Sequence, residues 1–246
     1  MILGGVLGVL GLALAGCSTL ASPHPAPGSP ATHAPTVTFA RQASPPPLAA
    51  TPTGPGYVGM IDPVWARETA DATGIPERAV LAYAGAAVRA AEVYPDCGIG
   101  WNTLAGIGLI ESDHGAFHGS SIGADFRVNP AIYGPILDGG DTANIPDTDG
   151  GTVDGNAQYD RAVGPMQLIP ATWASWPSDG NGDGVPDPQN IADESIAAAN
   201  SLCRASGGMT TPDGWRSGIA SYNVGSAYLK AVATAAKRYV DAAPTR

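Results

Sequence analysis

Residues 101–112 read WNTLAGIGLIES, and this stretch decides the fold we expect. Its apolar and small residues predict a helix over residues 101–113. Ile107 and Gly108 lie four and three residues before Glu111, so they share its face of the helix. Glu111 therefore continues an apolar stripe, where a carboxylate is costly to bury.

The position of Glu111 predicts an unusual carboxyl group. Burial disfavours its charged form, and the dipole at the C-terminal end of a helix disfavours an anion. Both effects raise the pKa of a carboxyl group. An acid that is still protonated near neutral pH can protonate a leaving oxygen. The alternative is a glutamate at a helix end with its carboxylate in water.

The rest of the chain predicts a mostly α fold. Asp62 as N-cap and Pro63 at the first helical position start a helix that Gly74 can end. Further helices are predicted at 76–93, 170–176, 193–206, 213–222 and 226–240. No segment shows strong strand alternation, and residues 115–165 are rich in Gly, Asp and Asn. We expect a single domain over residues 57–246, about 190 residues and large enough for one core.

The N-terminal segment predicts export and anchoring. Residues 1–16 are almost wholly apolar and are followed by Cys17, so that residues 14–17 read LAGC. This resembles a bacterial lipobox, and predicts a lipoprotein signal peptide over residues 1–17 with Cys17 as the lipid attachment site. The alternative is an uncleaved N-terminal helix. Residues 18–56 hold ten of the 23 prolines and predict a disordered linker. The protein is then extracytoplasmic and touches the membrane only through its lipid.

The two remaining cysteines form an even pair. If Cys17 carries lipid, Cys97 and Cys203 are left, and outside the cytoplasm such a pair is expected to be oxidised. The alternative is two buried free thiols.

Charge is concentrated in one part of the chain. The net charge of −10 argues against nucleic acid or an anionic membrane as the ligand. Eleven of the 22 acidic residues lie between Asp138 and Glu194, where Arg161 is the only base. Such a concentration needs solvent or cations.

One acidic loop has the spacing of a calcium site. Side-chain oxygens stand at positions 1, 3, 5 and 9, a carbonyl at position 7 and Gly184 at the sharp turn of position 6. The predicted Ca²⁺ ligands are Asp179, Asn181, Asp183, Val185 and Asp187. Position 12 is Asn190 and not Glu, which lowers the expected affinity or moves the last ligand to Asp193 or Glu194. The alternative is a solvated turn. Asp147, Asp149, Asp154 and Asp160 form a second, more loosely spaced acidic group.

Three segments together resemble a known family. Residues 108–112 (GLIES) are similar to the catalytic Glu-Ser segment of lytic transglycosylases. Residues 161–173 (RAVGPMQLIPATW) resemble their Gly-x-Met-Gln motif, and residues 220–223 (ASYN) resemble their Ala-Tyr-Asn motif, with Ser221 inserted. The closest resemblance is to the membrane-bound lytic transglycosylase B group in its actinobacterial form. It implies a lysozyme-like α fold, and calcium in an EF-hand-like loop is also known in that group.

The resemblance implies a reaction and a set of site residues. The reaction is cleavage of the β-1,4 bond between N-acetylmuramic acid and N-acetylglucosamine in peptidoglycan glycan strands, with a 1,6-anhydro product. Glu111 would act as the single acid and base. Residues carried over to the substrate cleft are Ser112, Gln167, Tyr222 and Asn223, and Tyr133 is a further candidate for the glycan groove. We expect a monomer.

Two other functions stay open. Asp160 could serve as a second carboxylate, which would give a muramidase that hydrolyses the bond as lysozyme does. The protein could also be a non-catalytic, calcium-dependent wall-binding protein. Trp173 and Trp176 could be sugar platforms, but aromatic residues three apart on a helix are more often core, and we expect Trp173 in the core.

Overall fold

The computed structural model describes residues 38–244. The predicted signal peptide, Cys17 and the first part of the predicted linker lie outside the described residues. The helical segments are η1 (Val58–Met60), α1 (Pro63–Thr73), α2 (Glu77–Val93), α3 (Trp101–Ser112), η2 (Phe117–Gly119), α4 (Pro170–Ser175), α5 (Ile191–Ser206), α6 (Pro212–Tyr222) and α7 (Ser226–Ala242). The mostly α class is confirmed.

Local signals account for the helix ends that the sequence predicted. The Asp62 carboxylate accepts hydrogen bonds from the backbone N–H groups of Val64 and Trp65, at 2.8 and 3.3 Å. Gly74 ends α1 in the left-handed conformation. Helix α5 begins two residues earlier than predicted, because the side chain of Asn190 caps it by accepting from Ala192 N–H.

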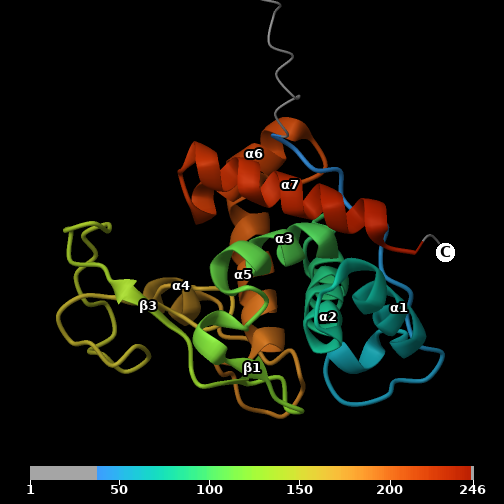
Figure 1. Cartoon of the computed structure of the whole chain (residues 1–246), viewed down its shortest axis with the longest axis horizontal. Helices are drawn as coiled ribbons and strands as arrows, with labels where there is room; N and C mark the ends of the chain where they lie inside the picture. The colour runs from blue at the N-terminus through green and yellow to red at the C-terminus, as the bar shows by residue number, and fades with distance from the viewer. Residues whose placement is uncertain (1–37, 245–246) are drawn as a thin grey trace, which may run out of the picture. The chain divides into compact units, whose positions relative to one another are not determined.

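Helix α3 lies in the interior of the helical body, packed against α2 and α7 (Figure 1). Its first eight residues are buried. Two glycines allow its neighbours to come close: a Cβ at Gly106 would lie 3.0 Å from the carbonyl oxygen of Val232 in α7, and one at Gly108 would lie 2.0 Å from the Tyr83 hydroxyl. These close contacts fix α3 between α2 and α7.

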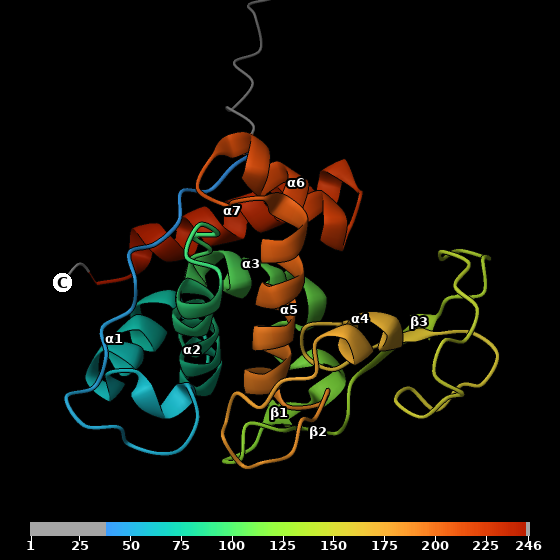
Figure 2. The same ribbon diagram turned by 180° about the vertical axis from the view of Figure 1, so that it is seen from behind.

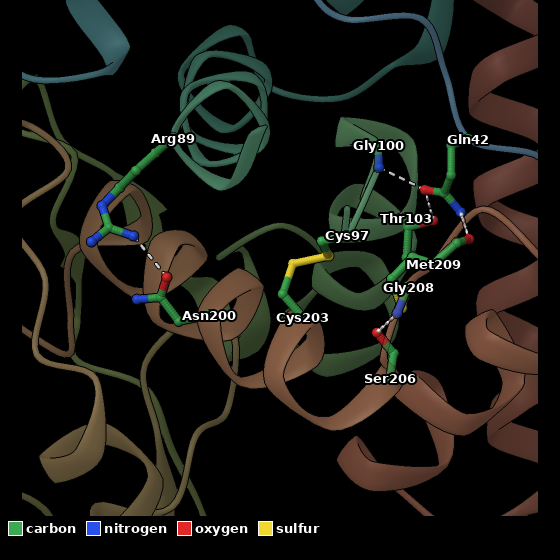
Figure 3. The surroundings of a disulfide bond; sticks show 10 residues. All are labelled: Gln42, Arg89, Cys97, Gly100, Thr103, Asn200, Cys203, Ser206, Gly208 and Met209. Carbon is green, nitrogen blue, oxygen red and sulfur yellow. Dashed lines mark hydrogen bonds between the residues drawn. A yellow bond between two sulfur atoms is a disulfide. The ribbon is translucent and has the colours of Figure 1, made fainter. Parts of the chain in front are cut away.

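A disulfide joins Cys97, in the loop before α3, to Cys203 near the end of α5 (Figure 3). The predicted pairing is confirmed. Helix α5 also runs beside α2 (Figure 2), and the Arg89 side chain donates a 2.7 Å hydrogen bond to Asn200 between them. These links set α5 against the helices that carry the rest of the core.

Residues 38–56 are folded against the domain, so the predicted linker does not extend to residue 56. Ala40 is buried, and the Gln42 side chain accepts hydrogen bonds from Gly100 N–H (2.6 Å) and the Thr103 hydroxyl (2.9 Å) (Figure 3). Asn102 in turn accepts from Ala43 N–H at 2.8 Å. A proline-rich composition predicts extended backbone. Here the extended segment of residues 38–56, which we call the strap, packs against the domain.

The middle of the chain contains short strands that the sequence analysis did not predict. In the described residues they are β1 (Ser121–Ile122), β2 (Val128–Asn129), β3 (Tyr133–Ile136) and β4 (Arg161–Val163). They form two antiparallel pairs, β1 with β2 and β3 with β4. With two to four residues each, they are too short to show alternation. Between β3 and β4, residues 137–160 form an irregular lobe that extends away from the helices (Figures 1 and 2).

Among residues 38–244, no helix combines the length and the apolar character that a membrane-spanning segment needs.

Candidate active site

Glu111 lies in the last turn of α3 and is half-buried. Burial raises the pKa of its carboxyl group to about 7, although a hydrogen bond from Tyr228 pulls the pKa in the opposite direction. Desolvation therefore outweighs the hydrogen bond. A carboxyl group with a raised pKa of this kind is suited to both donate and accept a proton.

Tyr228, in the first turn of α7, is the direct partner of Glu111. Its hydroxyl donates a 2.6 Å hydrogen bond to Glu111 Oε1. Burial, and then the neighbouring Glu111, raise the pKa of Tyr228, so the phenol stays protonated and acts as a donor. Sequence reasoning missed Tyr228, because it belongs to none of the three motifs and reads as an ordinary residue of an amphipathic helix.

The turn at residues 164–168 brings the three motif segments together. Its Pro165 carbonyl accepts a 2.6 Å hydrogen bond from the Ser112 hydroxyl, next to Glu111. Its Met166 carbonyl accepts a 2.5 Å hydrogen bond from the Tyr222 hydroxyl at the end of α6. Segments separated by more than fifty residues therefore meet at one place, beside the Glu111 carboxyl group.

Ser112 does not fit the predicted contact with substrate. It is 1% exposed, and its hydroxyl also accepts from Gly115 N–H at 2.8 Å. Both of its hydrogen bonds therefore go to the backbone. Its role is to fasten the end of α3 to the turn.

Gln167 is half-buried at the tip of the turn, with φ of 52°. This left-handed conformation is uncommon for a residue with a side chain. Its amide donates to the Gly164 carbonyl at 2.9 Å. Its Oε1 also lies beside Gly134, because a Cβ built there would be 2.7 Å away. Gln167 thus presents its amide between the turn and β3.

Tyr133 begins β3 and is 38% exposed. The guanidinium of Arg161 lies over its ring, 5.2 Å from the centroid, and Arg161 Nε donates to the Gly134 carbonyl at 2.9 Å. Since β3 pairs with β4, which leads directly into the turn, Tyr133 is on the same side of the domain as Gln167. The role of Tyr133 in the glycan groove stays a prediction.

The last residues of the third motif have different surroundings. Tyr222 is partly buried, and burial raises the pKa of its phenol. Asn223 is exposed at the C-terminal cap of α6, and its side chain accepts from Gly225 N–H at 3.0 Å. Only Asn223 of this pair has a side chain that solvent or a ligand reaches freely. Trp173 is 7% exposed in a small apolar cluster with Leu168, so its predicted place in the core is confirmed.

Glu194 was one of two alternatives for the last ligand of the predicted calcium loop. It is 0% exposed, in the first turn of α5, and burial raises the pKa of its carboxyl group. It accepts hydrogen bonds from the N–H groups of Met166 (2.5 Å) and Leu168 (3.2 Å). Glu194 therefore faces the turn and not the acidic loop, where it was considered as a last calcium ligand.

Two other carboxylates were weighed against Glu111. Asp113 is exposed in the left-handed conformation that ends α3, two residues after Glu111. Asp160 is 0% exposed, and its oxygens accept from the backbone N–H and hydroxyl of Thr148, at 2.9 and 2.8 Å. Asp160 therefore lacks the free oxygen that a flanking second carboxylate needs.

The donors of the loop at residues 179–187 fit a cation in part. Both Asp179 oxygens face into the loop and accept backbone N–H groups of residues 182–184. At position 9, however, Asp187 forms a 2.7 Å ion pair with Arg127. At position 12, the Asn190 side chain caps α5. The side-chain oxygens of Asn181 and Asp183 also accept hydrogen bonds within the loop, so both halves have protein partners and Ca²⁺ binding stays a prediction.

The second acidic group is partly assembled in the lobe. Asp147, Asp149 and Asp160 each place a carboxylate oxygen within 4.8 Å of the others. Their oxygens accept hydrogen bonds from the lobe itself, such as Gly150 N–H to Asp147 at 3.0 Å and Val153 N–H to Asp149 at 2.6 Å. These bonds shape the loop without any ion.

Glu111 does not line any of five pockets of about 310 to 500 Å³ found on the described residues. Comparisons with protein-family models, with curated proteins and with solved structures found no match for this chain.

Proposed function

We propose that the protein is a peptidoglycan lytic transglycosylase with a lysozyme-like fold and Glu111 as its single acid and base. One observation carries the proposal. The carboxyl group of Glu111 has a pKa raised to about 7 and receives a hydrogen bond from Tyr228, at the point where all three motif segments meet. A carboxyl group of this kind can donate a proton and then take one back at the same pH.

The first step breaks the glycosidic bond. Protonated Glu111 gives its proton to the oxygen between N-acetylmuramic acid and N-acetylglucosamine, and the bond from C1 to that oxygen breaks. The N-acetyl carbonyl oxygen of the substrate bonds to C1 and takes the place of a protein nucleophile. Tyr228 keeps its hydrogen bond to Oε1, so the carboxylate that forms is stabilised where it stands.

The second step closes the anhydro ring. The Glu111 carboxylate accepts the proton of the muramic acid 6-hydroxyl, and that oxygen attacks C1 as the N-acetyl oxygen leaves. The product is a 1,6-anhydro sugar, no water is consumed, and Glu111 regains its proton. Glycosidases that use two carboxylates need both beside the bond. The buried positions of Asp160 and Glu194 support the mechanism with a single carboxyl group.

The groups around Glu111 suit a glycan ligand. The amides of Gln167 and Asn223 can bind hydroxyl and N-acetyl groups, and the exposed ring of Tyr133 can stack on a sugar face. Ca²⁺ in the loop at 179–187 would be structural, held by Asp179, Asn181, Asp183 and the Val185 carbonyl. We also propose that the chain is exported, is anchored through Cys17 and acts as a monomer at the cell wall.

Substitution of Glu111 tests the enzyme proposal. The wild-type protein is expected to solubilise purified sacculi, and Glu111→Gln is expected to lose at least about a thousandfold in rate because the variant can neither give nor take the proton. Thermal unfolding of both proteins checks that the fold is intact. An inactive wild type would point to the non-catalytic wall-binding protein instead, and an unchanged rate in Glu111→Gln would mean that Glu111 is not the catalytic acid.

A further inference from the structure

Glu194 is a buried acid without a cationic partner among the ion pairs of residues 38–244. A carboxyl group at 0% exposure is costly to desolvate unless hydrogen bonds satisfy it. The hydrogen bonds that Glu194 receives come from Met166 and Leu168, the two residues on either side of Gln167. The Glu194 carboxyl group thus holds the backbone of the turn on both sides of Gln167.

The turn needs these hydrogen bonds because its backbone is strained at Gln167. Gln167 has φ of 52°, a left-handed conformation that is unfavourable for residues other than glycine. The Glu194 carboxylate is also in contact with the start of the turn: a Cβ at Gly164 would lie 2.5 Å from Glu194 Oε2 and 1.9 Å from the Pro188 carbonyl oxygen. Glu194 therefore touches the turn at both ends and holds the strained residue between them.

We infer that Glu194 is a positioning residue, which holds the Met166 and Leu168 amides and so fixes Gln167 in the orientation that binds the glycan. The inference rests on the proposed function. Glu194 itself touches no substrate, because it is fully buried. Glu194 also affects Tyr222 through Met166, because the Tyr222 hydroxyl donates a hydrogen bond to the Met166 carbonyl. Loss of the hydrogen bonds of Glu194 would let the turn at residues 164–168 move, without removing any group that is proposed to contact the substrate.

The preceding residue offers a matched control. Asp193 is also 0% exposed in the first turn of α5, and its carboxylate accepts from Gly180 N–H (2.7 Å) and Asp187 N–H (3.0 Å). Two adjacent buried acids thus hold two different loops. Asp193→Asn removes a carboxylate from the same helical turn without contact with the Gln167 turn.

The test is a double-mutant cycle on soluble, uncross-linked glycan strands. Glu194→Gln keeps the size but replaces one acceptor oxygen by a donor. We expect it to raise KM about threefold to tenfold, as for the loss of one hydrogen bond, with a smaller change in kcat. Gln167→Ala should raise KM similarly, and the double variant should be no worse than Gln167→Ala alone. Asp193→Asn should combine additively with Gln167→Ala.

Two outcomes overturn the inference: an unchanged KM in folded Glu194→Gln, or additive effects of Glu194→Gln and Gln167→Ala. If Glu194→Gln does not fold, the cycle is run with Glu194→Asp, which keeps the carboxyl group but shortens its reach to the turn, and the same outcomes apply.

Amide hydrogen exchange separates a failure of this inference from a failure of the proposed function. The Met166 and Leu168 amides should exchange faster in Glu194→Gln and not in Asp193→Asn, whether or not the wild-type protein cleaves glycan. Unchanged exchange in Glu194→Gln overturns the positioning role by itself. Lack of cleavage by the wild type overturns the proposed function and leaves the exchange result to decide on Glu194.

Discussion

The hydroxyl of Tyr228 donates a 2.6 Å hydrogen bond to the carboxyl group of Glu111, across 117 residues of sequence. The bond joins the last turn of α3 to the first turn of α7, two helices that pack closely against each other. It orients a carboxyl group whose pKa burial raises to about 7. The proposed proton transfer at Glu111 would therefore depend on a residue from a distant part of the sequence.

Removal of the Tyr228 hydroxyl should shift the pH dependence of activity. A donor to Glu111 favours the charged form, so Tyr228→Phe raises the pKa of Glu111 further above its ordinary value. Activity needs protonated Glu111 at the start, and the alkaline limb of the kcat/KM profile should move to higher pH. We also expect kcat to fall about tenfold, because the carboxyl group loses its orientation.

Tyr222→Phe is the matched control, because the Tyr222 hydroxyl bonds to the Met166 carbonyl and not to Glu111. Its alkaline limb should stay in place. An alkaline limb that is unmoved, or moves to lower pH, in Tyr228→Phe would contradict the geometry at Glu111.

Glu111 should also make stability depend on pH. Its pKa rises from 4.5 in the unfolded chain to about 7 in the folded protein, so the folded state binds the proton more tightly. The favourable protonation is complete below about pH 4.5 and is lost as pH rises through 7. Glu111→Gln stays neutral, and should exceed the wild type by about 1–3 kcal/mol in free energy of unfolding at pH 8.

The difference in free energy of unfolding between Glu111→Gln and the wild type should vanish near pH 4, where the wild-type carboxyl group is protonated in both the folded and the unfolded state. Denaturant unfolding at the two pH values measures it. A glutamine variant that is no more stable than the wild type at pH 8 would show that Glu111 is not desolvated.

The loop at 179–187 gives a prediction about Ca²⁺. Arg127 occupies the Asp187 carboxylate in a 2.7 Å ion pair, and so competes with a cation for a ligand. If the loop binds Ca²⁺, the ion raises the unfolding temperature, and Arg127→Gln tightens the binding by freeing Asp187. Calorimetric titration measures the affinity.

Asp179→Asn should abolish the calcium response, and Asp147→Asn in the lobe should leave it intact. A response that is lost in Asp147→Asn and kept in Asp179→Asn would assign the ion to the other acidic group.

The disulfide should stabilise the domain. It joins residues 106 apart in the chain, and the double variant Cys97→Ser/Cys203→Ser is expected to lose about 2–4 kcal/mol of unfolding free energy. A reducing agent should lower the unfolding temperature of the wild type and leave that of the double variant unchanged. Equal sensitivity of the two proteins would mean that the bond does not contribute.

The helices could be predicted because helix caps, helix-ending glycines and apolar periodicity all lie within or beside the helix itself. Asp62, Pro63 and Gly74 define α1 by their own chemistry, and the cysteine pair needed only counting. The strap at 38–56 was missed because its proline content resembles a linker, and what folds it is the long-range bonding of Gln42. Composition alone does not contain that partner.

The same limit applies to the site. Glu111 was predicted from its place on an apolar helix face, and burial does raise its pKa. Ser112 was assigned to substrate through its motif, but tertiary packing buries it against Pro165. Tyr228 and Glu194 act through contacts 117 and 28 residues away, for which no spacing rule exists. A first-turn acid such as Glu194 reads from sequence as a favourable helix start.

The most direct measurement of the central claim is the mass of the muropeptides released from purified peptidoglycan by the wild-type protein and by Glu111→Gln. If the protein is a lytic transglycosylase that uses Glu111, the wild type releases anhydro-muropeptides, which are lighter by one water than hydrolysed products, and the variant releases none above background. Release of reducing-end products would contradict it, because water and not the 6-hydroxyl of muramic acid would then be the attacking group.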